Sequence, residues 1–459
     1  MTIASYYLDA DTLGAAQNYA PLTQPTEAKV CVVGAGFAGL HTALSLVERG
    51  VKDVLLLEAE HVGFGASGRN GGFVFGGYSL GEAQLLRALG PASAKRWYLK
   101  TQAAVARIRS LIARYGIDCD CTDEGVLWVN WFADAAPLRA RQALLAENFD
   151  THWQPWNRAQ VQAAITSERY SNALFERNAL HLNPLKLARG LARAASAHGA
   201  RIFEYSPVQS ITQAGHSGAQ WRIQTPAGSV LAEHVVVAGG GYLQGEGSNL
   251  QKLKRALLPI ATYVLASEPL GAKASQLINT KAAIYDSRFA FDYYRLAPDT
   301  RLIWGGRISI LDRSAVQVSQ LLRADILRVF PQFEGLLELC EIPFDTQLGA
   351  GIDYAWSGLM SYARHEMPQI GRLEPGFWYA QAFGGHGLAP TCVAGETLAA
   401  AIAEGCLEYQ DLTRFGLAPT YGAAGRFAAQ LNYTWLQWQD AWHARNSHAR
   451  NPHARNSRA

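Results

Sequence analysis

The chain has 459 residues, of which 49% are hydrophobic and 17% charged, and its formal net charge is +3. This hydrophobic content suffices for two or more buried cores, which excludes a largely disordered chain. Four arginines of residues 443–459 supply much of the positive charge. The body is therefore close to neutral, and nothing in its charge indicates nucleic-acid binding.

The first predicted elements are a strand, a helix and a second strand. Residues 29–33 form a short, Val-rich run that ends at glycine, which is typical of a parallel strand buried on both faces. The pattern then predicts a helix over 37–49 and a strand over 53–57. This order, with glycines at the first turn, indicates a unit that binds the ADP half of a dinucleotide.

Each glycine of the turn has a physical role in that unit. Gly34 makes the tight turn, Gly36 lets the backbone approach a pyrophosphate, and Gly39 lets the helix lie close to the strand. The helix N-terminus favours the negative charge of the phosphates. Glu58 follows the second strand, where a carboxylate accepts hydrogen bonds from ribose hydroxyls and repels a 2′-phosphate. Phe37, Ala38 and Ala59 complete the residues that we expect here.

A glycine-rich segment comes next, over residues 63–72, with the sequence Gly-Phe-Gly-Ala-Ser-Gly-Arg-Asn-Gly-Gly. Five glycines in ten positions indicate backbone held against a ligand, and the polar side chains between them suit a pyrophosphate and the edge of a flavin ring. The alternative is a flexible surface loop. The predicted cofactor-binding residues of this segment are Gly65, Ala66, Ser67, Arg69, Asn70, Gly71 and Gly72.

Three motifs together carry a family resemblance. They are Ser5-Tyr6-Tyr7, the run from Val32 to Gly39, and the segment from Gly63 to Gly72. In them the chain resembles the D-amino-acid oxidase (DAO) superfamily of FAD-dependent oxidoreductases, particularly its γ-glutamylputrescine oxidoreductase-like members. The resemblance implies an α/β fold of the glutathione-reductase-like, DAO type. In it, a Rossmann-like FAD-binding domain is interleaved with a substrate domain built on a mainly antiparallel sheet.

Later segments are similar to further parts of the family's FAD site. Val208 corresponds to backbone that passes the adenine, although it is equally well explained as a buried strand residue. Ala238 and Gly239 lie in a strand-to-glycine turn. Residues 378–388 are similar to the family's Gly-His-Gly segment, before a predicted helix over 389–403 with Pro390 in its first turn. The expected flavin contacts there are Gly384, Gly385, His386, Gly387 and Leu388.

The spacing of these signals predicts discontinuous domains. The FAD-binding domain is expected to comprise 1–78, 180–250 and 356–430, and the substrate domain 79–179 and 251–355. Within the latter, the pattern predicts a helix over 93–115 and strands over 126–131, 257–265, 289–295 and 302–307. A mainly antiparallel sheet would then form a roof over the flavin ring.

Candidate catalytic residues come from this roof, the glycine-rich segment and the Gly-His-Gly segment. Alternation along 289–295 places Phe289, Phe291, Tyr293 and Arg295 on one face, and Asp292 and Tyr294 on the other. Arg295 would hold a substrate carboxylate if the first face meets the flavin; otherwise Tyr294 would orient the substrate. Arg69 is a candidate for either the substrate or the cofactor. His386 is a candidate hydrogen-bond donor or a packing residue.

The C-terminal part contains an apolar stripe and a low-complexity tail. Leu431, Trp435, Trp438 and Trp442 recur at helical spacing, and we expect them to dock on the body rather than lie at a membrane interface, because the intervening residues are not basic. Residues 443–459 repeat His-Ala-Arg-Asn and are predicted to be disordered. Cysteine usage, an N-terminus without a signal-like pattern and the lack of a long apolar run favour the cytoplasm.

The resemblance implies hydride transfer from the carbon bearing an amine to the flavin, giving an imine that hydrolyses. No metal is expected. Noncovalent FAD is predicted, because residues 358–371 lack the cysteine that holds flavin covalently in some relatives. The expected enzyme is an oxidase of γ-glutamylputrescine-like polyamine derivatives or amino acids, with O2 as acceptor and H2O2 as product. The alternatives are an oxidase of L-pipecolate or sarcosine-like substrates, a dehydrogenase with a quinone or carrier acceptor, and an inactive flavoprotein subunit.

Overall fold

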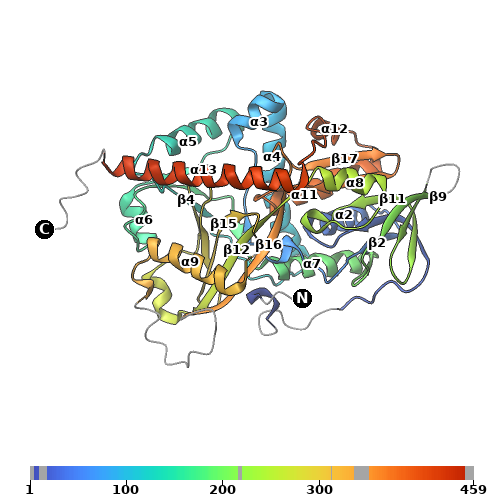
Figure 1. Cartoon of the computed structure of the whole chain (residues 1–459), viewed down its shortest axis with the longest axis horizontal. Helices are drawn as coiled ribbons and strands as arrows, with labels where there is room; N and C mark the ends of the chain where they lie inside the picture. Colours follow the sequence, from blue (N-terminus) through green and yellow to red (C-terminus); the bar gives the residue numbers. More distant parts are fainter. Residues whose placement is uncertain (1–4, 10–17, 215–219, 312, 335–350, 450–459) are drawn as a thin grey trace.

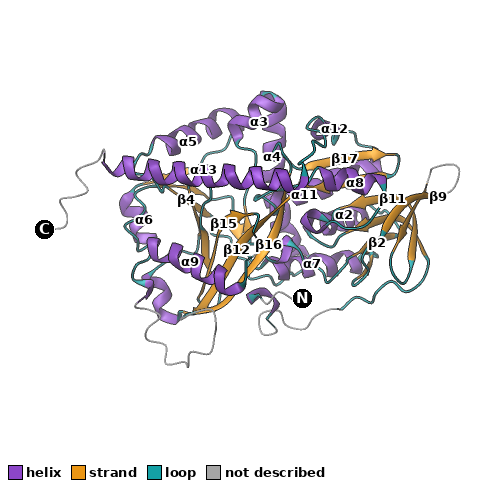
Figure 2. Cartoon of the chain, viewed as in Figure 1, coloured by secondary structure: helices purple, strands orange, loops and turns teal. Residues whose placement is uncertain are grey.

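A computed structural model describes residues 5–9, 18–214, 220–311, 313–334 and 351–449. Two large sheets lie side by side, and the helices cover them (Figures 1 and 2). The arrangement is mixed α/β, with one largely parallel and one mainly antiparallel sheet, as predicted from the sequence.

The first sheet contains the predicted nucleotide-binding strands. Its main path runs β17 (Gln369–Glu374), β18 (Phe377–Gln381), β11 (Ser229–Val237), β1 (Thr26–Val33), β2 (Val54–Leu57) and β8 (Arg201–Phe203), with β10 (Gln220–Gln224) and β9 (Ser210–Ala214) beside β11. The strands β18, β11, β1, β2 and β8 run parallel to one another, and the edge strand β17 is antiparallel to β18. Val30 and Val32 of β1 belong to one hydrophobic core, and Cys31 and Val33 to another on the opposite face. Burial on both faces explains why residues 30–33 of this strand are all apolar.

Helices from distant parts of the chain cover one face of this sheet. They are α2 (Phe37–Glu48), α4 (Pro91–Arg114), α7 (Pro184–Ala197) and α11 (Leu388–Glu404), which share the first core with β1 and β2. α8 (Ser248–Arg255) packs on the opposite face through Leu250 and Leu253. The helices α3 (Glu82–Leu89), α5 (Ala136–Phe149) and α12 (Gln410–Thr413) lie at the periphery (Figure 2).

The second sheet is antiparallel except for one pair, β13 with β4. Its order is β16 (Ile352–Tyr362), β12 (Leu258–Pro269), β15 (Arg301–Ser309), β14 (Tyr293–Leu296), β13 (Ala283–Asp286), β4 (Val126–Val129), β6 (Ala173–Glu176) and β5 (Gln154–Trp156). One face packs against α9 (Ala315–Val329) and α6 (Arg158–Ala164). The predicted boundary at residue 356 falls inside β16, all of which belongs to this sheet.

Small elements join the two sheets. A two-stranded ladder pairs β3 (Phe73–Val74) with β7 (Leu180–His181), and short 3-10 turns are formed by Tyr6–Leu8, Ala66–Gly68, Gly240–Tyr242 and Gly271–Gln276. Tyr7 is fully buried, and its ring packs edge-on against Trp356 at 5.4 Å between centroids. The N-terminal Ser-Tyr-Tyr motif is therefore part of the core between the sheets.

The C-terminal helix α13 (Gly422–Ala449) lies across the molecule (Figure 1). Its predicted apolar stripe is exposed rather than docked: Leu431, Trp435, Trp438 and Trp442 are each more than 50% accessible. The opposite face makes the contacts, because Gln430 bonds to Ile310 and Asp440 accepts the backbone N–H of Phe289.

The helix continues to Ala449, beyond residue 443 where the predicted disordered tail begins, and residues 450–459 lie outside the described part. No helix in the described ranges has the length and apolar character needed to span a bilayer.

Candidate functional site

A cavity of about 650 Å³ lies between the two sheets. At one end it is lined by turns that follow the carboxyl ends of β1, β2 and β11, where ligands bind in parallel α/β sheets. At the other end it is lined by residues of the second sheet and by Tyr433 of α13. One ligand at the first end and another at the second would therefore share a single space.

The three glycines after β1 leave no room for side chains. A Cβ on Gly34 would lie 2.7 Å from the carbonyl oxygen of Ala238, and Gly34 has a φ of +108°. A Cβ on Gly36 would lie 2.9 Å from Ser67 Oγ, and one on Gly39 would lie 1.9 Å from the Gly34 carbonyl oxygen. We call Gly34, Gly36 and Gly39 the glycine cradle. Gly34 and Gly36 line the cavity, whereas Gly39 lies behind them and allows α2 to approach β1.

Glu58 follows β2 at the rim of the same end. Its two carboxylate oxygens accept the backbone N–H groups of Ala35 at 2.7 Å and Glu60 at 3.0 Å. Burial raises the pKa of Glu58, while these N–H groups oppose that rise. Each oxygen has one further lone pair, which suits the ribose hydroxyls of an adenosine. Val208 lines the cavity beside it, as expected for the adenine position.

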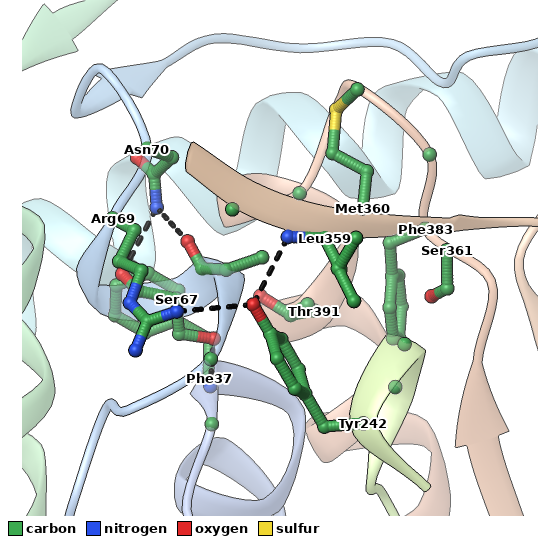
Figure 3. A pocket seen from close by; sticks show the side chains of 18 of the residues that line it. Phe37, Ser67, Arg69, Asn70, Tyr242, Leu359, Met360, Ser361, Phe383 and Thr391 are labelled. Carbon is green, nitrogen blue, oxygen red and sulfur yellow. Dashed lines mark hydrogen bonds between the residues drawn. The ribbon is translucent and has the colours of Figure 1, made fainter. Parts of the chain in front are cut away.

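The glycine-rich segment is an ordered structure and not a loose loop. Ser67 Oγ accepts the Phe37 N–H at 2.9 Å, so that the segment caps the start of α2. Asn70 donates to the carbonyl groups of Ala66 and Ser67, both at 2.9 Å. Arg69 Nη1 donates to the Tyr242 hydroxyl at 3.2 Å, and that hydroxyl also accepts the Leu359 N–H (Figure 3). These bonds fix the segment against both sheets.

Two observations show that these residues fit FAD. The Nη2 group of Arg69 is buried and has no partner, although Arg69 lines the cavity, so it is available to an acceptor on a ligand. At the other side, Gly384, Gly385 and Gly387 precede α11, whose free N-terminal N–H groups stabilise negative charge. A Cβ on Gly384 would meet Ser79 Oγ at 2.2 Å, so only glycine lets this turn pass.

The substrate end of the cavity is aromatic. We call Phe73, Phe75, Tyr285, Phe291 and Tyr293 the aromatic wall; all five line the cavity and each ring lies within 6.5 Å of the next. His386 packs edge-on against Phe75, with 4.9 Å between the ring centroids. Burial lowers the pKa of His386 to about 4, so it is neutral near pH 7. This end of the cavity favours an uncharged reacting amine over an ammonium ion.

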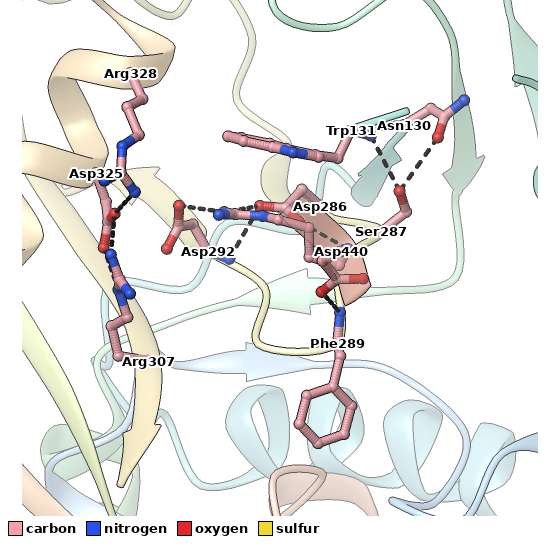
Figure 4. Close-up of polar contacts among 11 residues, drawn as sticks. Asn130, Trp131, Asp286, Ser287, Phe289, Asp292, Arg307, Asp325, Arg328 and Asp440 are labelled. Carbon is pink, nitrogen blue, oxygen red and sulfur yellow. Dashed lines mark hydrogen bonds and ion pairs between the residues drawn. The ribbon is translucent and has the colours of Figure 1, made fainter. Parts of the chain in front are cut away.

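Charged residues at this end are largely paired with one another. Arg307 lines the cavity, and its Nε and Nη2 groups both bond to Asp325 at 2.7 Å (Figure 4). Arg288 lies between Asp286 and Asp292, with its guanidinium 3.7 Å from the centre of the Trp131 ring. The backbone N–H of Phe289, at the cavity edge, is held by Asp440 of α13 (Figure 4).

Most of the predicted cofactor-binding residues lie together in this cavity. The lining includes Gly34, Gly36, Phe37, Ala38, Glu58, Ala59, Gly65, Ala66, Ser67, Arg69, Asn70, Gly71, Val208, Ala238, Gly239, Gly384, Gly385, His386, Gly387 and Leu388. Gly39 and Gly72 are not in contact with it. Gly72 has a φ of +80°, and a Cβ there would meet the Leu182 carbonyl oxygen at 1.8 Å, so its role is to let the backbone turn.

Two predicted catalytic residues lie elsewhere. Tyr294 is fully buried in the second core and stacks on Trp304 with 4.3 Å between centroids, away from the cavity. Arg295 is 2% exposed, and its guanidinium donates to the carbonyl groups of Gly71 and Leu182 at 2.8 and 2.9 Å. It therefore anchors the glycine-rich segment instead of meeting a substrate carboxylate. Phe289 lies in the turn before β14 and not on a strand with Tyr293.

The sequence analysis did not single out several lining residues. Tyr242, Leu359, Met360, Glu366 and Tyr433 all line the cavity. Tyr242 stood within a recognised motif, and its position after a strand-to-glycine turn was the available signal. The other four come from β16, from the turn after it and from α13, whose approach to the cavity depends on tertiary packing.

Comparisons with known proteins agree with this site. Residues 29–401 match the protein family DAO, described as FAD dependent oxidoreductase. The chain is 33% identical to the gamma-glutamylputrescine oxidoreductase of Escherichia coli, over 86% of this chain and 88% of that protein. It is 32% identical to a probable oxidoreductase, OrdL, of Haemophilus influenzae, over 87% of this chain and 88% of that protein.

Solved structures share the fold. The glycine oxidase of Geobacillus kaustophilus superposes with a TM-score of 0.68 at 21% identity, covering 86% of this chain and 99% of that one. An L-proline dehydrogenase from P. horikoshii superposes with a TM-score of 0.67 at 16% identity, covering 85% and 98%.

Proposed function

The chain belongs to the DAO family of FAD-dependent oxidoreductases, and from that premise we propose that it oxidises the carbon next to an amine in a γ-glutamylputrescine-like polyamine derivative. The product would be an imine, which water hydrolyses to a carbonyl compound and an amine. FAD, when bound, supplies the acceptor for the hydride that leaves this carbon.

The observation that carries the proposal is the continuity of the cavity. The glycine cradle and Glu58 suit the ADP half of FAD, and the same space continues to the aromatic wall, where a substrate carbon would face the cofactor. The similarity to a gamma-glutamylputrescine oxidoreductase over most of the chain supports the substrate class.

The chain's own residues would prepare the amine for oxidation. A nitrogen must be uncharged before its lone pair can assist loss of hydride from the neighbouring carbon, and the aromatic wall favours that form by excluding water. His386 is neutral near pH 7, so it adds no positive charge that would repel a cationic substrate on entry. Arg69 and the start of α11 would hold the cofactor.

Two finer points belong to the same proposal. We propose noncovalent FAD, because no cysteine occurs among the described residues that line the cavity. We propose O2 as the acceptor, giving H2O2; the exposed tryptophan face of α13 favours a membrane or carrier acceptor as the second candidate. The cytoplasm remains the expected compartment.

The test is anaerobic reduction of the purified, FAD-loaded protein, followed by admission of air. We expect γ-glutamylputrescine to bleach the flavin absorbance faster than L-pipecolate, sarcosine, proline or D- and L-amino acids, and air to restore it rapidly. If only an amino acid bleaches the flavin, that amino acid replaces γ-glutamylputrescine as the proposed substrate. Slow recovery of the absorbance in air would favour a membrane or carrier acceptor over O2. Flavin that stays with the peptide after acid precipitation would contradict noncovalent binding.

A further inference from the structure

The substrate end of the cavity contains one carboxylate that oxidation of a simple amine does not require. Glu366 lies in the turn between β16 and β17, where its exposed side chain lines the cavity. Its φ is +61°, in the left-handed region that residues other than glycine rarely adopt. Glycine would occupy this turn more easily. Because strained backbone is retained mainly where a side chain serves a function, a glutamate at this position points to a use for its charge.

Two tyrosines lie near this carboxylate. Tyr362 and Tyr433, which also line the cavity, are close enough to Glu366 for its charge to act on both phenols. Burial, assisted by that charge, raises the pKa of Tyr433 to about 12, so the phenol is neutral near pH 7. The ring of Phe289 lies 5.7 Å from that of Tyr433. A carboxylate with aromatic faces beside it is the combination that binds an ammonium group.

The remaining charges leave Glu366 uncompensated. Arg307 is held at two nitrogens by Asp325, and Arg69 lies over the Phe64 ring on the cofactor side. Among the described residues, none forms an ion pair or a side-chain hydrogen bond with the Glu366 carboxylate. Glu366 is therefore an unpaired carboxylate at this end of the cavity, which attracts a cation and repels a free carboxylate.

We infer that Glu366, together with the rings of Tyr362 and Tyr433, binds a second, protonated nitrogen of the substrate while the first nitrogen is oxidised at the flavin. The inference rests on the proposed function and makes it narrower. It predicts substrates with two amino groups separated by a chain, and it disfavours simple amino acids, whose only other charge is a carboxylate.

The experiment compares matched substrates on the FAD-loaded enzyme. The pairs are putrescine with butylamine, and γ-glutamylputrescine with its form acetylated at the distal α-nitrogen. We expect the unmodified member of each pair to have the higher kcat/KM. Glu366→Gln should lower kcat/KM for that member by about 10- to 100-fold, mainly through KM, as expected for loss of a hydrogen bond to a charged group. For the other member the change should be less than about threefold.

Controls separate this role from a structural one. Glu147→Gln makes the same change of charge at an exposed position of α5. It should leave kcat/KM unchanged for both members of each substrate pair. Glu366→Asp should keep the preference for the second nitrogen. Glu366→Gly relieves the left-handed strain, so it should raise the thermal midpoint while abolishing the preference; this variant also serves if the glutamine variant folds poorly.

An equal effect of Glu366→Gln on both members of a pair would overturn the inference while leaving amine oxidation in place. If no amine bleaches the flavin, the proposed function fails. Calorimetry of putrescine and butylamine binding to the FAD-loaded protein still decides the inference in that case. Tighter binding of putrescine that is lost in Glu366→Gln supports it, and equal binding of the two amines refutes it.

Discussion

The two ends of the cavity are built in different ways. At the cofactor end, backbone atoms form the surface: the glycine cradle brings main chain to within van der Waals contact of main chain, and Ser67 fixes the start of α2. At the substrate end, side chains from the second sheet, from β3 and nearby loops and from α13 form the surface, and rings pack against rings. The first surface tolerates almost no substitution, whereas the second can change its chemistry residue by residue.

The two kinds of surface suit two kinds of ligand. Backbone geometry suits a cofactor that is the same in every member of the family, and exchangeable side chains suit substrates that differ among members. Four substitutions would test whether the two ends of the cavity are separable in this way.

The first prediction tests the rigidity of the cofactor end. Gly39→Ala places a Cβ 1.9 Å from the Gly34 carbonyl oxygen, so α2 must move away from β1 and the cradle must open. We expect the purified protein to contain almost no flavin, measured as the ratio of absorbance near 450 nm to that near 280 nm. Gly81→Ala is the matched control, because its Cβ would meet nothing closer than 3.7 Å. Full flavin content in the Gly39→Ala variant would contradict this account.

The second prediction concerns Arg295, which lies in β14 of the second sheet but supports the glycine-rich segment at the cofactor end. Arg295→Lys removes the planar guanidinium that bonds to the Gly71 and Leu182 carbonyl groups, and an ammonium group cannot replace both bonds. We expect the free energy of unfolding to fall by about 2–4 kcal/mol in urea titrations, with weaker retention of flavin. An unchanged unfolding curve with altered substrate preference would instead restore Arg295 as a substrate contact.

The third prediction is that the free energy of unfolding depends on pH through Glu176, a buried residue of β6. Burial raises the pKa of Glu176 to about 7 from an ordinary value of 4.5, so the folded protein holds this proton more tightly than the unfolded chain. Its favourable contribution is therefore complete below about pH 4.5 and is lost as the pH rises to about 7. Glu176→Gln should raise the free energy of unfolding at pH 8 by about 1–3 kcal/mol relative to the wild type and should flatten the slope between these values. An unchanged slope would show that Glu176 does not titrate there.

The fourth prediction tests how freely the substrate end can change. Tyr433→Ala removes the ring that α13 contributes to the substrate end, where it packs against Phe289. We expect about a tenfold rise in KM for the amine substrate and an unchanged flavin content. A loss of flavin in this variant would show that the two ends are not separable.

The sequence predicted the cofactor end well because its physical requirements restrict residue type. Only glycine fits at positions such as Gly34 and Gly384, and a carboxylate such as Glu58 must stand at a set distance along the chain. The buried end of the strand before the cradle was also recognisable, since burial on both faces at residues 30–33 of β1 excludes polar residues. These constraints act on residues at set positions along the chain, so they appear in the sequence as a characteristic spacing of residue types.

The substrate end was harder because the decisive contacts join distant segments. The predicted strand over 289–295 begins only at Tyr293, because Asp286 accepts the N–H groups of Arg288 and Asp292 and turns the chain before it. The docking face of α13 was predicted wrongly for a related reason. Helical spacing reveals an apolar stripe but not its direction, and the contacts with the body come from Gln430, Asp440 and the buried ring of Tyr433.

The interleaving of the two sheets has a consequence for synthesis on the ribosome. The glycine cradle lies within residues 34–39, whereas the helix start at the other side of the cavity lies at Gly387. A nascent chain that already contains the first glycines must therefore be extended past residue 387 before FAD can be enclosed. The unfinished first sheet, lacking β18 until residue 381, would expose an open strand edge during that interval, which makes this a protein whose yield should depend on chaperones and on flavin supply.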